Sequence, residues 1–302
     1  GARHLSRVVP VSSRRGGRRV WSAAMKDGLI LSLLSILPRK LVSRTMGAGT
    51  RLALPRSIHR AFLRWYVGHY GVNLAECVGG IDDYPTIAEF FTRALLPEVR
   101  PVADGAGTLV SPVDARVYVI GTTTNGRIPQ SPELDYPLQT LLGGDQRYVH
   151  AEYAVLYLAP KDYHRVHSPR EGGIVGYRYR PGELWPVFPG ATRKVRELFA
   201  RNERLVIRLA TDLGEIAVVM VGAFGVGRMA LAFADTITNT GGVAEEHAFD
   251  APLPIARAAE VGRFCMGSTV VLLLPAGSVR WTVQAGDDVK LGQPIAQTVP
   301  AS

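Results

Sequence analysis

The stretch Glu260-Val-Gly-Arg-Phe-Cys-Met-Gly267-Ser268-Thr269-Val-Val-Leu-Leu-Leu274 organises the rest of this chain. A serine follows a glycine and leads directly into an apolar, β-branched run that predicts a buried strand. Gly267 has no Cβ, so its carbonyl can be approached closely, and the Ser268 hydroxyl could attack the preceding peptide bond. On this triplet alone a structural Gly-Ser turn is the better explanation, so the choice depends on segments further upstream.

Two upstream segments carry side chains that would suit a reactive serine. Ser111-Pro112-Val113-Asp114 places a carboxylate at a turn after an apolar strand, and His164 and His167 follow another strand, three residues apart. Asp114, His167 and Ser268 could form a base-activated nucleophile, in which Asp114 orients the imidazole and His167 takes the hydroxyl proton. A metal site at the two histidines is the weaker alternative, because no third ligand has a clear place. The chain has no Gly-x-Ser-x-Gly motif, which disfavours a secreted-type hydrolase.

Composition predicts a globular protein and argues against a nucleic-acid partner. Of the 302 residues, 47% are hydrophobic and 20% charged, which leaves ample material for a core. The net charge is +9, but residues 1–24 contain six arginines and no acid, so the remainder is only mildly basic. That balance suits an anionic membrane surface better than a nucleic acid. The two cysteines, Cys77 and Cys265, are too few for a disulfide framework or a zinc site.

The N-terminal part predicts a leader followed by amphipathic helices. Residues 1–24, rich in Arg, Ser and Gly, are expected to form a disordered leader. Apolar positions recur at helical spacing between residues 27 and 37, and Pro38 marks the expected end of that helix. A second helix is predicted over residues 56–70, with aromatic and basic side chains on different faces. Such helices are typical of membrane interfaces, but packing against the domain core explains the periodicity equally well.

A third helix is predicted to begin at Thr86, where the hydroxyl would cap the backbone while Glu89 reaches back. Phe90, Phe91 and Leu95 would form its apolar side. Prolines and glycines then break the chain. We therefore expect a helical, membrane-associating region over residues 25–107.

From residue 108 to the C-terminus the chain predicts short strands separated by glycine and proline. The expected strands are 108–110, 115–120, 154–158, 174–179, 204–209, 216–221, 269–274 and 279–283, with one helix near 192–200. The predicted fold class is α+β, with N-terminal helices followed by a β-rich catalytic body over residues 108–302. Its C-terminal part is expected to be barrel-sandwich-like, because residues 281–296 resemble half of a biotinyl/lipoyl carrier domain without an attachment lysine.

Several motifs together resemble the pyruvoyl-dependent phosphatidylserine decarboxylases of bacteria and mitochondria. They extend over nearly everything from about residue 27 to the end, in the order and spacing of that family. The matching residues are Tyr84-Pro85-Thr86, Phe90-Phe91-Thr92-Arg93, Ser111-Pro112 with Asp114, Asp162-Tyr163-His164-Arg165-Val166-His167, Pro181-Gly182-Glu183-Leu184, Phe199 with Asn202-Glu203-Arg204, and Glu260 with Gly262, Phe264 and Gly267-Ser268-Thr269. Two positions depart from the family pattern: Met266 stands where leucine is frequent, and Ala115 where a glycine commonly follows the aspartate.

The resemblance implies a self-processing enzyme. Ser268 would attack the Gly267 carbonyl with Asp114 as orienter and His167 as base, and elimination would cut the chain into a β chain, residues 1–267, and an α chain, residues 268–302. The serine left at the new N-terminus would become a covalent pyruvoyl group, which condenses with the amine of phosphatidylserine and accepts electrons when carbon dioxide leaves. His164 is the candidate acid that returns a proton. No metal is implied.

The expected partners are phosphatidylserine, an anionic membrane surface and the second cleaved chain in an αβ heterodimer, and a homo-oligomer is compatible with the sequence. The expected location is the cytoplasmic face of the bacterial inner membrane, as a peripheral protein, with the mitochondrial inner membrane as the alternative. A substrate with another amine is a second enzyme hypothesis. A non-catalytic lipid-binding or carrier-like protein that retains the fold is the alternative function.

Overall fold

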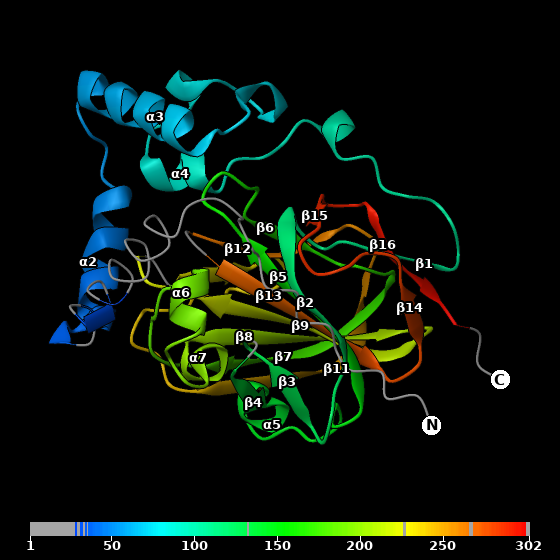
Figure 1. Ribbon diagram of the computed structural model, residues 1–302. Coiled ribbons are helices and arrows are strands. Elements are labelled where there is room, and N and C mark those ends of the chain that lie inside the picture. The colour runs from blue at the N-terminus through cyan, green and yellow to red at the C-terminus, as the bar shows by residue number, and fades with distance from the viewer. Residues whose placement is uncertain are drawn as a thin grey trace, which may run out of the picture.

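A computed structural model describes residues 28, 31–32, 34, 36–131, 133–225, 228–265 and 268–299. The N-terminal leader, Met266 and Gly267 lie outside these residues. Figure 1 shows the N-terminal helices gathered at one end of the molecule and a strand-rich body beside them. The α+β class with helices first is therefore confirmed.

The helices are short apart from the first two, and the strands range from two to eleven residues. The helices are α2 (Arg39–Thr50), α3 (Arg56–Tyr70), α4 (Ile87–Phe91), α5 (Leu138–Leu141), α6 (Pro189–Thr192) and α7 (Leu198–Arg201). The strands are β1 (Thr108–Val110), β2 (Ala115–Thr122), β3 (Arg127–Pro129), β4 (Asp135–Pro137), β5 (Ala151–Leu158), β6 (Arg165–His167), β7 (Gly172–Arg180), β8 (Arg204–Thr211), β9 (Gly214–Gly222), β10 (Met229–Leu231), β11 (Glu245–Ile255), β12 (Glu260–Phe264), β13 (Ser268–Pro275), β14 (Val279–Trp281), β15 (Asp288–Val289) and β16 (Pro294–Thr298).

An eight-stranded antiparallel sheet forms the centre of the body, in the order β11-β7-β8-β9-β13-β5-β2-β15. Strand β13 therefore lies in the interior of the sheet, between β9 and β5. Its side chains alternate between two apolar clusters, with Val270 and Leu272 in one and Val271 and Leu273 in the other. Because both faces of the strand are buried, it reads as a continuous apolar run rather than as an alternating pattern.

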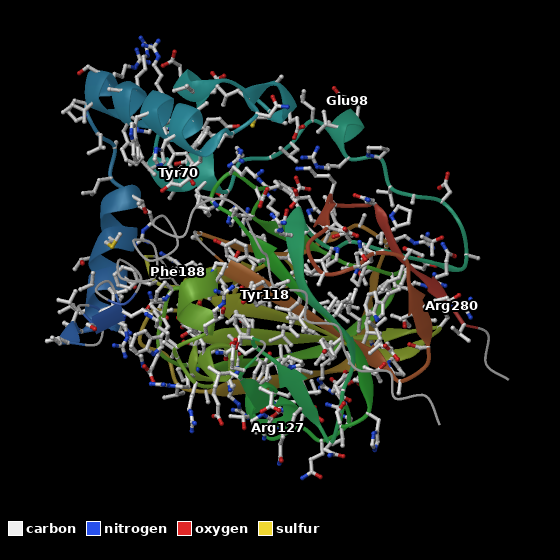
Figure 2. The ribbon with its side chains drawn as sticks, viewed as in Figure 1. Tyr70, Glu98, Tyr118, Arg127, Phe188 and Arg280 are labelled. Atoms are coloured by element: carbon white, nitrogen blue, oxygen red, sulfur yellow. The ribbon has the colours of Figure 1, made fainter. Side chains whose placement is uncertain are left out.

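Each face of the large sheet is covered by different elements. One cluster is completed by the small sheets β1-β16-β14 and β10-β12-β6, and the other by α5, α6, α7 and the β3-β4 hairpin. On the helical side, the Tyr118 hydroxyl lies 2.8 Å from the Thr192 hydroxyl at the end of α6, and Phe188 packs against the same cluster (Figure 2). No sheet in the described part of the chain closes into a barrel, so the C-terminal carrier-like run is a small open sheet plus the edge strand β15.

The N-terminal helices differ from the prediction in one respect. The first predicted helix ends before Pro38 as expected, since residues 28, 31, 32, 34 and 36 are helical and Pro38 is not, but Pro38 is also the N-cap of α2, which the sequence analysis did not predict. Helix α3 has the predicted bounds, and Gly71 closes it in the left-handed conformation at φ 73°. Helix α4 begins after Thr86, whose hydroxyl accepts a hydrogen bond from the Glu89 amide at 3.2 Å.

The helices carry apolar side chains on both their inner and outer surfaces. Leu63 of α3 packs with Phe90 of α4 in a third apolar cluster. On the outer surface Ile58 and Trp65 remain 58% and 53% exposed. Among the described residues, no helix is both long enough and apolar enough to cross a bilayer.

Candidate active site

Ser268 is the first residue of β13 and is completely buried. It is paired with Leu158 at the end of β5 and with Gly222 at the end of β9. Its hydroxyl has no hydrogen-bond partner among the described residues. The hydroxyls of Thr269, Tyr136 and Tyr153 also lack a described partner. What distinguishes Ser268 is that its unpaired hydroxyl belongs to the residue directly after Gly267, next to the peptide bond that it would attack.

The His164 loop is connected to the region of Ser268 through two chain segments. The loop that carries His164 leaves β5 directly after Leu158, the pairing partner of Ser268. The His164 carbonyl also accepts a hydrogen bond from the Phe264 amide at 2.9 Å, at the end of the strand that leads toward Ser268. The segment before the serine therefore contacts His164, and the strand after it pairs with the strand from which the His164 loop leaves.

The protonation state of His164 follows from its surroundings. Its Nδ1 lies 2.8 Å from the Asp162 carbonyl oxygen, which can only accept, so Nδ1 carries the proton. Its Nε2 is buried and has no partner among the described residues. Complete burial lowers the pKa of His164 to about 3. At neutral pH this imidazole is therefore uncharged and presents a lone pair at Nε2.

His167 has a different environment. Its Nδ1 lies 2.7 Å from the Ala258 carbonyl oxygen, so its Nε2 accepts from the Tyr163 hydroxyl at 3.2 Å. Burial also lowers the pKa of His167, and it raises the pKa of Tyr163 to about 12. The strand pairing puts His167 opposite Glu260, four residues before Phe264, so it is His164 that adjoins the end of β12 nearest Ser268.

Asp114 is buried in a network of cations rather than beside an imidazole. Its carboxylate accepts from Arg100 at 2.6 Å, from Lys290 at 3.2 Å and from the Leu291 amide at 2.9 Å. Arg100 also pairs with Glu76 at 2.6 Å. Burial raises the pKa of Asp114, but the Arg100 and Leu291 hydrogen bonds and the Lys290 charge outweigh it, so that pKa lies below its usual range.

The predicted residues are therefore brought together only in part. The expected hydrogen bond between Asp114 and His167 is replaced, because both ring nitrogens of His167 have the partners described above. Burial lowers the pKa of both histidines, and the negative charge of Asp114 offsets a small part of that lowering in each. The backbone between β1 and β2 also reaches His167, whose amide donates to the Pro112 carbonyl at 2.9 Å. The cleavage position Gly267 lies outside the described residues.

Ala115 needs no special conformation. It is the first residue of β2 and does not have a positive φ, so the absence of the family's glycine does not strain the turn after Asp114. Cys265 is half-buried and free, and burial raises the pKa of its thiol, which keeps it protonated at neutral pH.

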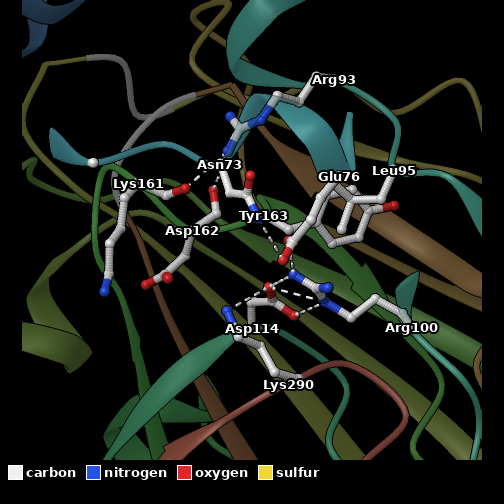
Figure 3. Close-up of a pocket in the computed structure, with 11 residues that line it drawn as sticks. Asn73, Glu76, Arg93, Leu95, Arg100, Asp114, Lys161, Asp162, Tyr163 and Lys290 are labelled. Atoms are coloured by element: carbon white, nitrogen blue, oxygen red, sulfur yellow. Dashed lines mark hydrogen bonds and ion pairs between the residues drawn. The ribbon is translucent and has the colours of Figure 1, made fainter. Parts of the chain in front are cut away.

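Two cavities lie near the His164 loop. One, of about 110 Å³, is polar, and Arg93, Arg100, Asp114, Asp162, Tyr163 and Lys290 are among its lining residues (Figure 3). The other, of about 290 Å³, is almost wholly apolar and is lined by Met46, Gly49, Thr50, Phe62, Leu63, Tyr66, Ile87, Phe90 and Phe91 from α2, α3 and α4. The Phe91 ring lies 4.1 Å from the His164 ring, so a side chain of the apolar cavity wall contacts the candidate catalytic histidine.

A family model described as phosphatidylserine decarboxylase matches residues 87–297, which include every site residue discussed so far except those of α2, α3 and Glu76. The chain belongs to the phosphatidylserine decarboxylase family. Three relatives named phosphatidylserine decarboxylase proenzyme come from Anaeromyxobacter sp. (strain K), Myxococcus xanthus and Brevibacillus brevis. They are 44%, 40% and 38% identical to this chain, and each alignment covers 90% of it and 99% of the relative.

The sequence analysis did not identify several residues that shape this decarboxylase-family site. Tyr163 lies inside the quoted motif, but only the fold shows that its hydroxyl contacts His167. Arg100, which pairs with Asp114, belongs to a proline-bounded segment that was read only as a break between regions. A guanidinium far from any motif gives no sequence signal, because its partner is fixed by tertiary packing.

Proposed function

We propose that the protein converts phosphatidylserine to phosphatidylethanolamine and carbon dioxide, using a pyruvoyl group that it makes from its own Ser268. The observation that carries this proposal is the buried Ser268 hydroxyl without a described partner, at the start of the central strand of a family member. In maturation the Gly267 acyl group moves from the Ser268 nitrogen to its hydroxyl oxygen. Elimination then releases a β chain ending at Gly267 and leaves a dehydroalanine at the start of the α chain. Water hydrolyses this residue to the pyruvoyl group, and its nitrogen leaves as ammonia.

Ser268 fits the role of precursor to such a group. It is fully buried, so water reaches it poorly, and it opens a strand that is paired on both sides. The pyruvoyl group supplies a carbonyl that binds the substrate amine and accepts the electron pair released with carbon dioxide. Holding that group on a central strand would fix its orientation, since β13 cannot shift without breaking both ladders.

We assign the proton transfers of turnover to His164. Its free lone pair at Nε2 can take a proton from the substrate ammonium, which must become neutral before it can react. The same atom then returns that proton to the substrate carbon after carbon dioxide leaves. Because the resting imidazole is neutral, His164 acts as an acid only after it has first acted as a base.

The apolar cavity beside Phe91 supports a lipid as the substrate. One of its lining side chains, Phe91, contacts the ring of His164, and the cavity is lined almost entirely by carbon from α2, α3 and α4. A soluble amino acid would gain no binding free energy from such a surface. A bound acyl chain would remove the apolar surface of the cavity from water.

We further propose that the helices dock on an anionic membrane surface. Helix α3 presents Ile58 and Trp65 to solvent together with the exposed, basic Arg56 and Arg64, and it contains no acidic residue. Aromatic and apolar side chains would enter the lipid interface while the arginines pair with headgroups. We therefore propose a peripheral location at the cytoplasmic face of the bacterial inner membrane.

The test is the intact mass of the purified protein beside a Ser268→Ala variant, followed by a decarboxylation assay. We expect two fragments split after Gly267, with the small one lighter by one ammonia than a serine-started peptide, and a single mass for the variant. The processed protein should release carbon dioxide from phosphatidylserine in vesicles but not from free serine. A single full-length mass in the presence of membranes would contradict self-processing and favour a non-catalytic lipid-binding protein.

A further inference from the structure

Arg93 is a buried cation without a counter-ion. Its side chain lies directly after α4, the residue is only 3% exposed, and it forms no ion pair with any described residue. Its Nη2 donates to the carbonyls of Lys161 at 2.8 Å and Asp162 at 3.2 Å, and its Nη1 donates to the Phe90 carbonyl at 3.4 Å, while its Nε is buried without a described partner. A buried charge that lacks an opposite charge is costly, so it is expected to serve an anion.

Other buried arginines of the described chain show how unusual this is. Arg100 and Arg170 each form bidentate hydrogen bonds to an aspartate. Arg204 also lacks a carboxylate, but each of its three nitrogens donates to a backbone carbonyl. Arg93 is neither neutralised nor fully hydrogen-bonded.

The cavity that Arg93 lines has its charges arranged unevenly. On one side, Asp114 accepts from both Arg100 and Lys290, so these cations are compensated (Figure 3). On the other side Arg93 stands near Lys161, which is exposed and forms no ion pair with a described residue. The Asp162 carboxylate also lines this side and accepts a hydrogen bond from the Ala159 amide, so two cations stand against one carboxylate. A net positive charge therefore remains on the Arg93 side, in a space of about 110 Å³.

Arg93 also lies next to the proposed catalytic histidine. Its Nη2 and the Nδ1 of His164 donate to the same oxygen, the carbonyl of Asp162. Phe90 and Phe91, just before Arg93 in the chain, line the apolar cavity. An apolar cavity, a histidine and a cationic cavity thus follow one another across the turn at residues 90–93, as an amphipathic phosphate ester would require.

We propose that Arg93, with Lys161, binds the phosphodiester of the phospholipid substrate. The inference rests on the proposed function and adds the residue that positions its headgroup. The substrate carboxylate is the other available anion, but its charge disperses as carbon dioxide leaves, so a guanidinium on it would stabilise the ground state more than the transition state. The phosphodiester keeps its charge throughout, and a planar guanidinium can bind two of its oxygens at once.

The experiment compares soluble headgroups as inhibitors of the processed enzyme acting on phosphatidylserine in mixed micelles. The probes are glycerophosphoserine, which has both anions, and glycerophosphoethanolamine, which has only the phosphodiester. In Arg93→Gln we expect inhibition by both to weaken about 10- to 100-fold, with KM rising more than kcat falls. Arg127→Gln is the matched control, because Arg127 is a surface residue on the far side of the body from Tyr70 (Figure 2), and both inhibition constants should stay unchanged.

Each other outcome overturns the inference in a distinct way. Weaker inhibition by glycerophosphoserine alone would assign Arg93 to the carboxylate, and unchanged inhibition by both would leave it as a brace for the His164 loop. If Arg93→Gln does not yield processed, folded protein, Lys161→Gln carries the test, with about three- to tenfold weaker inhibition by both probes expected and no change overturning the inference. Failure of the proposed function would look different, because the processed protein without substitutions would then release no carbon dioxide from phosphatidylserine.

Discussion

Asp114→Asn, made in a Ser268→Ala background, tests whether Asp114 acts mainly as a structural anchor. The Ser268→Ala change keeps both proteins as single chains, so stability is compared without differences in processing. Asparagine retains an oxygen that can accept from the Leu291 amide but removes the charge that Arg100 and Lys290 share. Arg100, whose side chain is 9% exposed, would keep only Glu76.

The expected loss follows from the burial of each partner. Removing one member of a buried ion pair typically costs about 3–5 kcal/mol, because the other charge stays buried without compensation. Lys290 is half-exposed and loses little, and Glu76 still offsets part of the Arg100 charge. We therefore expect the free energy of unfolding to fall by about 2–3 kcal/mol, which corresponds to a Tm lower by roughly 3–5 °C for a chain of this size.

Urea and thermal unfolding at several pH values would measure this loss. The pKa of Asp114 is lowered in the folded protein, so its contribution is complete above the unfolded pKa of about 3.9 and is lost as pH falls toward the folded pKa. The difference between the two proteins should therefore shrink below about pH 4. Asp135→Asn is the control, because its ion pair with Arg127 is exposed and should contribute less than about 1 kcal/mol. Equal stability of the Asp114→Asn and parent proteins at pH 7 would refute the hypothesis that Asp114 stabilises the fold through its ion pairs.

Three further predictions concern processing, turnover and membrane binding. Tyr163→Phe removes the hydroxyl that donates to Nε2 of His167. If that Nε2 takes the serine proton directly, processing followed by mass spectrometry should accelerate up to about fivefold. Slower processing would instead indicate that the proton passes through the tyrosine. The kcat/KM of decarboxylation should show no acidic limb near pH 6.5, because burial lowers the pKa of His164 to about 3; a limb there would mean that the imidazole is solvated. Trp65→Ser should weaken sedimentation with anionic vesicles about tenfold, since half of that side chain is exposed. Val243→Ser, at an exposed site outside the helices, is the control and should not weaken it. Equal effects of the two changes would argue against α3 as the docking surface.

Most of the long buried strands of the central sheet were predicted, although the predicted β5 began three residues late and the short strands β6, β10 and β12 were not predicted. The run after Ser268, for example, appears as β13 within one residue of its expected bounds, because apolar β-branched residues in the interior of a sheet leave little choice of structure. By contrast β11 was missed over all of its eleven residues, since it is an exposed edge strand with a polar and proline-containing sequence. Helix α2 was missed for a related reason, because Pro38 fits the start of a helix as well as its end.

The candidate site divides in a similar way. The residue types and their order could be read from the motifs, because Ser268, His164 and His167 sit at strand ends that a β-rich body brings together. Their hydrogen-bond partners could not be read in this way. The Ala258 carbonyl that accepts from His167 comes from a distant loop, and Arg100 reaches Asp114 from the connection to the helices. Such contacts depend on how loops cross the sheet, which no local pattern encodes.

The central position of β13 has a consequence for the lifetime of the protein. The strand is hydrogen-bonded along its length to β5 on one side and to β9 on the other, and residues beyond it pair with β1 and β2. Once the chain is cut before Ser268, the short chain could leave only if the sheet were pulled apart. A centre inactivated at position 268, by reduction or by a trapped amine, could therefore not be renewed by exchange with a fresh short chain. Each polypeptide would have a single opportunity to build its reactive group, and lost activity would be restored only by new synthesis.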